Sequence, residues 1–312
     1  MIETSFTRLV GCRLPLQQAG MGGSATAQLA SAVSEAGGLG MLGLTGMPVG
    51  VAAAAVEAAA ARTSRPFGVN FLMPFLDREA VEIAASRCRV VEFFYGDPDT
   101  ALVAAAHAGG AFASWQVGSL EEARAAADSG CDMVVVQGVE AGGHVRGQVG
   151  LLPLLDLVLD AVPVPVVAAG GLGSARAVAA VIAAGAAAAR VGTRFLAAEE
   201  ADVHPSYLDA LVRARAEDTV VTTTFSQLWP DAPHRVLRSC VGAALDMHDD
   251  VIGQTELAPG IQVPVLRLSP PSPGRSTTGQ VEGMALYAGQ SVDHVAGRTT
   301  AAQIVAELTT GL

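Results

Sequence analysis

The stretch VPVVAAGGLGSARAVAAVIAAGAAAARVGTR, residues 164–194, contains two short apolar runs on either side of an alanine-rich segment. The runs at 164–169 and 188–191 have the length and the apolar character of buried strands. Ser174 opens the segment 174–184, which predicts a helix, since a serine side chain can bind the free amide groups of a first helical turn. A strand, a helix and a second strand in this order predict one parallel βαβ unit.

The same alternation of strand and helix runs through the first two thirds of the chain. Further strands are predicted near 13–18, 39–43, 67–71, 90–94, 111–116 and 133–137. Helices are predicted near 25–36, 49–61, 78–87, 98–108, 120–129 and 151–161. Eight strand–helix units are enough to close a (β/α)8 barrel. The predicted fold class is therefore α/β, a parallel TIM barrel.

After the eighth strand the alternation stops. A helix-like segment is followed by sequence rich in Thr, Pro and Ser, up to about residue 282, and a last barrel helix is predicted near 291–309. The predicted organisation is therefore a barrel formed by residues 1–204 with 286–312, and a cap formed by residues 205–285. The cap is expected to shape the substrate site.

Composition narrows the function classes. The chain has 312 residues, 51% hydrophobic, and no run approaching the roughly 20 uninterrupted apolar residues of a membrane-spanning helix. A formal net charge of −11 disfavours nucleic acid and anionic membranes as partners. All 19 basic residues are arginines, which excludes Schiff-base chemistry on a lysine. The four cysteines have no paired spacing and no signal peptide is recognisable, so a reducing cytoplasm is expected.

Polar residues and glycines gather where the predicted strands end. Asn70, Gln116 and Gln137 end strands three, five and six, and barrel enzymes place their chemistry at these carboxyl ends. Glycine loops follow strands seven and eight, where backbone amides commonly bind a phosphate. The residues expected to form this phosphate site are Gly170, Gly171, Gly192 and Thr193.

His144 is the predicted general acid or base. It directly follows Gly142 and Gly143, and an imidazole titrates near neutral pH. The alternative is a loop histidine that makes one structural hydrogen bond. The other five histidines receive no catalytic role, and none stands at metal-ligand spacing from Cys or a carboxylate, so no metal site is predicted.

The sequence resembles the nitronate monooxygenase family, formerly called 2-nitropropane dioxygenases. This family includes FMN-dependent enoyl reductases and quinone reductases. The resemblance spans almost the whole chain in the same order. The matching runs are Gln18–Met21, Gly37–Gly40, Phe67–Asn70, Gln137–His144, Ala169–Leu172, Val191–Phe195 and Leu286–Gln290.

The resemblance implies a bound FMN and a catalytic role for His144. It places Asn70 and Gln137 near the flavin ring or its ribityl chain. Tyr287 and Gln290 are the candidate substrate-binding residues. The implied cofactor-binding residues are Ala19, Gly20, Met21, Asn70, Gln116, Gln137, Gly142, Gly143, Gly170, Gly171, Arg190, Val191, Gly192 and Thr193.

Two positions depart from the family pattern. Gly20 stands where many members carry proline, which loosens the loop expected under the flavin. Val145 separates His144 from Arg146, where a histidine followed directly by arginine is frequent, and this leaves the role of Arg146 open.

The expected reaction is the oxidation of an alkyl nitronate, with FMN as the electron relay and O2 as the acceptor, to a carbonyl compound and nitrite. The partners are then a small-molecule substrate and O2, with a homodimer as an open oligomeric alternative. An NAD(P)H-dependent reductase acting on a quinone or an enoyl thioester would use the same motifs. The net charge offers no obvious basic docking surface for an acidic acyl carrier protein, which favours the oxidase. A barrel that binds a phosphorylated ligand without turnover is the third alternative.

Overall fold

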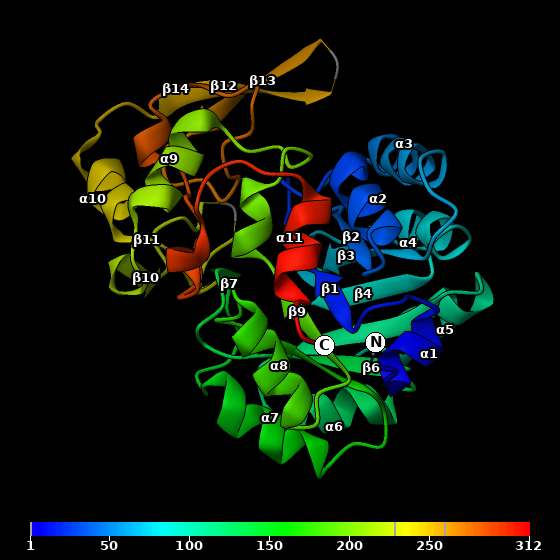
Figure 1. Ribbon diagram of the computed structural model, residues 1–312. Coiled ribbons are helices and arrows are strands. Elements are labelled where there is room, and N and C mark those ends of the chain that lie inside the picture. Colours follow the sequence, from blue (N-terminus) through cyan, green and yellow to red (C-terminus); the bar gives the residue numbers. More distant parts are fainter. Residues whose placement is uncertain (1, 228, 259) are drawn as a thin grey trace.

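Eight parallel strands form the centre of the molecule (Figure 1). The computed structural model describes residues 2–227, 229–258 and 260–312. The strand order is β1-β9-β8-β6-β5-β4-β3-β2, and a parallel bridge between Gln17 and Leu39 joins the first strand to the last. The (β/α)8 barrel is therefore confirmed. The strands are β1 (Leu16–Gln18), β2 (Gly40–Gly43), β3 (Phe67–Leu72), β4 (Val90–Phe94), β5 (Phe112–Val117), β6 (Met133–Gln137), β8 (Val166–Ala169) and β9 (Ala188–Val191).

Helices surround these strands (Figure 1). The predicted start at Ser174 is confirmed, because its hydroxyl accepts a hydrogen bond from the amide of Ala177 at 3.3 Å. The last helix, α11, packs between α8 and α2 and so completes the ring. The helices of the ring are α2 (Ala27–Glu35), α3 (Val49–Ala60), α4 (Arg78–Ala85), α5 (Thr100–Ala108), α6 (Leu120–Asp128), α7 (Leu151–Leu159), α8 (Ala175–Ala183) and α11 (Ala301–Leu308).

A short helix that the sequence pattern did not predict closes the amino-terminal end of the barrel. It is α1 (Ser5–Val10), and its Phe6 and Val10 are fully buried. Both pack against the lower barrel interior, which is apolar and includes Leu39, Met41 and Val90. This end of the barrel is therefore a packed core, and the polar residues lie toward the other end.

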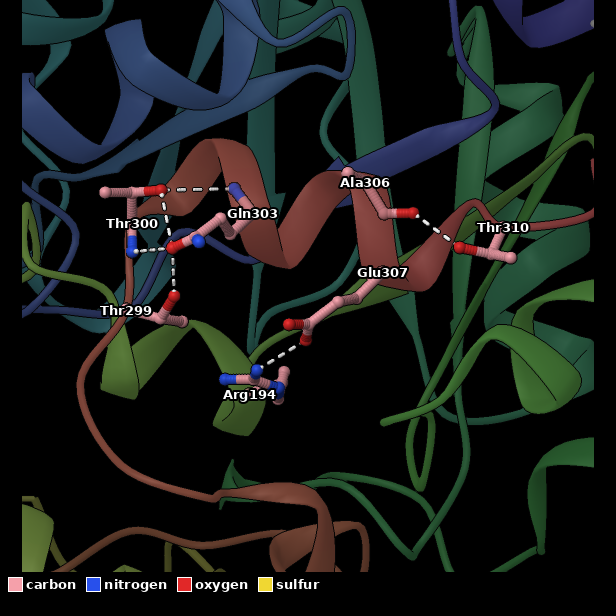
Figure 2. A network of polar contacts seen from close by, with 7 residues as sticks. All are labelled: Arg194, Thr299, Thr300, Gln303, Ala306, Glu307 and Thr310. Carbon is pink, nitrogen blue, oxygen red and sulfur yellow. Dashed lines mark hydrogen bonds and ion pairs between the residues drawn. The ribbon is translucent and has the colours of Figure 1, made fainter.

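The predicted start of the last helix, at residue 291, is wrong. Residues 291–309 form a 3-10 turn, η5 (Val292–His294), followed by a break and then by α11. Gly297 in the break has φ +118°, which no right-handed helix contains. The helix begins after Thr300, whose hydroxyl accepts from the amide of Gln303 at 3.2 Å (Figure 2).

Arg194, in the loop after β9, fastens α11 to the barrel. Its Nη2 lies 2.7 Å from Oε2 of Glu307 in the last turn of the helix (Figure 2). Arg194 belongs to η2 (Thr193–Ala197) and is buried, so its side chain faces the helix layer. Within the described ranges, no helix has the length and apolar character needed to cross a membrane.

The segment between η2 and η5 lies beside the barrel strands (Figure 1, upper left). Two small antiparallel sheets organise it, with strand orders β10-β11-β7 and β13-β12-β14. The first sheet includes β7 (Gly143–His144) from the loop after β6, so this segment pairs directly with a barrel loop. The other elements are α9 (Pro205–Arg213), η3 (Ala216–Asp218), β10 (Thr219–Thr222), β11 (His234–Leu237), α10 (Arg238–Asp246), β12 (Val251–Ala258), β13 (Ile261–Leu266), β14 (Thr278–Gly279) and η4 (Val281–Gly283).

Candidate active site

Polar side chains line the inside of the barrel on alternate strand positions. Side chains of a strand alternate between its two faces, so Val91 and Phe93 on β4 pack toward the helices while Glu92 points inward. The neighbouring register pairs Glu92 with Asn70 on one side and Ser114 on the other. The inward polar residues, all of them buried, are Gln17, Asn70, Glu92, Ser114, Gln116, Gln137 and Arg190.

Glu92 and Arg190 form an ion pair across the barrel interior. Arg190 Nη1 lies 2.5 Å from Glu92 Oε1, and Asn70 Nδ2 donates to the same oxygen at 2.8 Å. Glu92 is 0% exposed. The side chain of Arg190, one of the implied cofactor-binding residues, therefore points into the barrel, and its charge neutralises a carboxylate that could not otherwise be buried.

Several atoms of this polar layer have no partner among the described residues. They are both polar atoms of Gln17, Oε2 of Glu92, Oγ of Ser114 and Oε1 of Gln137. Buried polar atoms in native proteins are almost always hydrogen-bonded, to protein, ordered water or a ligand. Donors and acceptors thus face the barrel interior below the strand ends, which fits the hydrogen-bonding edge of a polar ring such as a flavin.

The loops after β1 and β9 lie together at the carboxyl end of the barrel. The amide of Ala19 donates to the backbone oxygen of Val191 at 2.9 Å. A Cβ placed on Gly192 would lie 3.4 Å from the Cβ of Ala19 and 3.8 Å from Sδ of Met21. These predicted residues therefore share one place in the fold.

Gly20 brings its loop onto Asn70. A Cβ at Gly20 would lie 2.6 Å from the Cβ of Asn70 and 2.9 Å from the backbone oxygen of Leu42. Any side chain there would push the loop away from β3. Close packing on β3 therefore explains why a glycine stands at position 20, where many family members carry proline.

The glycines after β6 and β8 adopt backbone conformations that other residues avoid. Gly143, Gly170 and Gly171 have φ values of +78°, +114° and +68°. Gly142 lies against the loop after η4, since a Cβ there would be 2.4 Å from the amide nitrogen of Gly289. The hydroxyl of Thr193 accepts from that same amide at 3.0 Å. The structure thus joins these loops at one end of the barrel.

His144 lies on β7 opposite His234 of β11. Gln137 supports it from β6, because its Nε2 donates to the backbone oxygen of His144 at 3.0 Å. The imidazole is surrounded by rings. Trp229 stacks on it at 4.0 Å between centroids and 23° between planes, and Tyr95 and Tyr287 each lie 5.7 Å away.

The enclosure keeps His144 neutral. Burial, and secondarily the nearby His234, lowers the pKa of His144 from 6.5 to about 3. Its Nε2 is buried and has no hydrogen-bond partner among the described residues. At neutral pH the imidazole is therefore uncharged. Its Nε2, with or without the single ring proton, is free to bind a substrate among the surrounding aromatic rings.

His234 is the structural histidine of the pair. It is 0% exposed, and burial lowers its pKa. Its Nδ1 lies 2.8 Å from the backbone oxygen of Ala232, and its Nε2 accepts from the amide of Phe225 at 3.2 Å. Because Nε2 is an acceptor there, Nδ1 carries the proton and donates, which fixes one neutral tautomer.

Acidification should destabilise the fold through His144. The unfolded chain binds a proton at this residue below about pH 6.5, whereas the folded chain does so only near pH 3, so stability falls as the pH falls between these values. The expected contribution is a slope of up to about 1.4 kcal/mol per pH unit. Urea unfolding of the wild type and His144→Asn at pH 7, 6 and 5 measures it. Equal slopes for both proteins would show that the histidine is not held neutral.

Arg146, whose role the sequence left open, joins three loops. Its Nη2 lies 2.6 Å from Oδ1 of Asp97, and its Nε lies 2.5 Å from Oε1 of Glu122. Glu122 in turn accepts from the amide of Gly118 at 2.7 Å. Arg146 therefore ties the histidine loop to the loops after β4 and β5.

The two candidate substrate residues lie differently. The ring of Tyr287 is in the enclosure of His144, and its hydroxyl donates to the backbone oxygen of Pro270 at 2.6 Å. Gln290 meets the histidine loop only through its backbone, whose amide donates to the oxygen of Glu140 at 2.9 Å, and its side chain is exposed. Only Tyr287 is thus placed beside the imidazole.

Sequence reasoning missed four residues of this site. Glu92, Tyr95, Trp229 and His234 were assigned no role, yet all four lie in the polar layer or around His144. Glu92 carried a usable signal, because a carboxylate within the apolar strand 90–94 requires a buried partner. The other three reach His144 only through tertiary contacts.

Comparisons with known proteins agree with this architecture. The family model described as nitronate monooxygenase matches residues 3–82 and 73–311. The protein named (3aS,4S,5R,7aS)-5-hydroxy-7a-methyl-1-oxo-octahydro-1H-indene-4-carboxyl-CoA dehydrogenase, from Mycobacterium tuberculosis, is 38% identical over 242 residues, which cover 76% of this chain and 67% of that protein.

Two further proteins resemble the chain over most of its length. A nitronate monooxygenase from Pseudomonas aeruginosa is 32% identical over 269 residues, covering 71% of this chain and 77% of that protein. The structure of FabK from Thermotoga maritima has a TM-score of 0.84 and 31% identity, covering 99% of this chain and 95% of that one. The family model spans nearly the whole chain, and the chain is an oxidoreductase that belongs to the nitronate monooxygenase family.

Proposed function

We propose that this protein binds FMN at the carboxyl ends of its strands and oxidises alkyl nitronates with O2 to carbonyl compounds and nitrite. The observation that carries the proposal is the neutral imidazole of His144, enclosed by aromatic rings beside a layer of unpaired polar atoms. The name of the Pseudomonas aeruginosa relative supports the same reaction.

The residues present suit FMN. Gln137 and Ser114 have buried polar atoms without partners, which can bind the heteroatoms of a flavin ring. Gly170, Gly171, Gly192 and Thr193 supply backbone amides and a hydroxyl for its phosphate, in a chain that has no lysine to do so. When bound, FMN supplies the redox chemistry by accepting electrons from the substrate and passing them to O2.

His144 handles the substrate proton. A neutral imidazole can accept the α-proton of a nitroalkane, and the nitronate so formed would raise the pKa of the ring by its negative charge. Trp229 and Tyr95 keep water away from that nitrogen by covering the ring from two sides. Tyr287 covers a third side and holds the loop after η4 in place through Pro270.

A second candidate is the dehydrogenation of a coenzyme A thioester. It is favoured by one observation, the 38% identity to a relative named as a carboxyl-CoA dehydrogenase. Both candidates use the same barrel end and the same histidine, so the sequence motifs do not separate them.

Reduction of the bound flavin in the absence of O2 separates the candidates. The purified protein is expected to show flavin absorbance, which propyl nitronate bleaches and NADH or NADPH does not. Bleaching by a nicotinamide would show the NAD(P)H-dependent reductase, and bleaching by an acyl-CoA alone would show the thioester dehydrogenase. A protein that takes up no flavin even when FMN is supplied would contradict the proposal.

A further inference from the structure

We propose that Trp229 is the positioning residue of His144 and that it fixes the plane of the imidazole by face-to-face stacking. This role rests on the proposed function of His144, and it assigns part of the active site to the 205–285 segment. Histidines that transfer protons are usually held by a hydrogen bond from the second ring nitrogen to a carboxylate or carbonyl.

The imidazole of His144 lacks such a bond. Its Nε2 is buried without a partner among the described residues. Gln137 contacts the residue, but it binds the backbone oxygen and not the ring. The orientation of the ring must therefore come from packing.

Trp229 is the neighbour that can define the plane of the ring. It meets His144 with centroids 4.0 Å apart and planes 23° apart, which is a stacked arrangement. Tyr95 lies edge-on at 85°, and Tyr287 is tilted by 48°, both at 5.7 Å. An aromatic pair contributes a stabilisation beyond its buried area that is comparable with that of one hydrogen bond.

The indole is itself held from the barrel side. Phe75 of η1 (Met73–Phe75) meets it edge-on at 5.1 Å and 90°, and Tyr95 does so at 4.7 Å and 75°. The side chain is only 8% exposed, and the Trp229 amide donates to the backbone oxygen of Ser226 at 2.9 Å. Two barrel loops thus clamp a residue of the 205–285 segment against the histidine.

Within residues 2–227, 229–258 and 260–312, the titratable and charged groups around His144 are neutral or already paired. From β11, His234 is neutral by burial, and its two nitrogens are already bonded. From the barrel loop, burial raises the pKa of Tyr95 to about 12, and burial also raises the pKa of Tyr287. Arg146 is the nearby cation, and it is paired with Asp97 and Glu122. Stacking is then the directional contact that remains.

Two substitutions separate stacking from simple burial. Trp229→Leu keeps an apolar side chain but removes the ring, and Trp229→Phe keeps an aromatic face. We expect kcat on 1-nitropropane, the neutral substrate whose α-proton His144 removes, to fall about 10-fold in Trp229→Leu with a smaller change in KM, and to stay within about 2-fold in Trp229→Phe. Phe112→Leu, which removes an aromatic ring that packs under Arg89 at the amino-terminal end of the barrel, is the matched control.

The ring signals of His144 in nuclear magnetic resonance spectra provide a readout independent of turnover. Trp229→Leu removes the ring current of the indole itself, so the orientation is read from nuclear Overhauser contacts between the imidazole protons and the rings of Tyr95 and Tyr287. These contacts should be lost in Trp229→Leu and kept in the control variant. Unchanged contacts with wild-type kcat in Trp229→Leu would overturn the proposal. If the wild type is inactive on nitroalkanes but the contacts with Tyr95 and Tyr287 are still lost only in Trp229→Leu, the positioning role stands and the proposed reaction falls.

Discussion

Replacing Glu92 by leucine is expected to lower the free energy of unfolding by about 3–5 kcal/mol. The substitution leaves the guanidinium of Arg190 in the barrel interior without its carboxylate, which lies 2.5 Å away in the wild type. It also removes the acceptor of the Asn70 amide. Arg190→Met should cost a similar amount, since it leaves a fully buried carboxylate without its cation. Urea denaturation of flavin-free protein measures both.

The double variant Glu92→Leu with Arg190→Met tests the cause. It removes both charges, so it should be more stable than either single variant. Arg8→Met is the matched control, because Arg8 pairs with Glu3 at the surface, where the two side chains are 61% and 69% exposed. That change should cost no more than about 1 kcal/mol. A double variant that loses the sum of the two single costs would contradict a coupled buried pair.

The barrel could be predicted because its signal is local and repeated. Each strand is a short apolar run and several helices have a start signal, so neighbours in the sequence suffice to recognise the unit at 164–194. The observed β8 and β9 lie within the predicted runs at 164–169 and 188–191. Helix α1 lacked such support, because six residues give too little periodicity for a prediction.

The polar layer was only partly predictable. Asn70, Gln116 and Gln137 were found because they stand near the carboxyl ends of their predicted strands, and the structure places all three in the barrel interior. The inward direction of the Arg190 side chain could not be predicted in that way, since its partner Glu92 lies 98 positions earlier on another strand. Whether a strand residue points inward depends on register, which the sequence of one strand does not specify.

The surroundings of His144 were hidden for the same reason. His234 stands opposite His144 because β11 pairs with β7, a pairing between segments about ninety residues apart. Trp229 reaches the imidazole from a stretch rich in Thr, Ser and Pro that shows no helix or strand pattern. Tyr95 has φ +66°, an uncommon conformation that directs its ring toward the same site.

Substituting His144 by asparagine should have the largest effect on turnover. Asparagine retains polarity and much of the volume of the side chain but cannot take up a proton, and loss of a positioned general base typically costs about 100-fold to 10,000-fold in rate. Flavin content should stay close to that of the wild type, because His144 lies on β7 and is not one of the loop residues expected to bind the phosphate. Steady-state oxidation of a neutral nitroalkane, together with the flavin-to-protein absorbance ratio, measures both quantities.

The comparison of substrates refines this result. If His144 removes the α-proton, a preformed nitronate should rescue much of the lost rate in His144→Asn, since that proton has already left. His248→Asn is the matched control, because His248 is exposed and lies outside the ring enclosure. Equal losses on nitroalkane and nitronate would instead assign the histidine to binding the anion, which requires a protonated ring and thus a pKa well above about 3 in the complex. Unchanged turnover on both substrates would remove His144 from the mechanism and leave His234, Tyr95 and Tyr287 as the titratable side chains that surround this position.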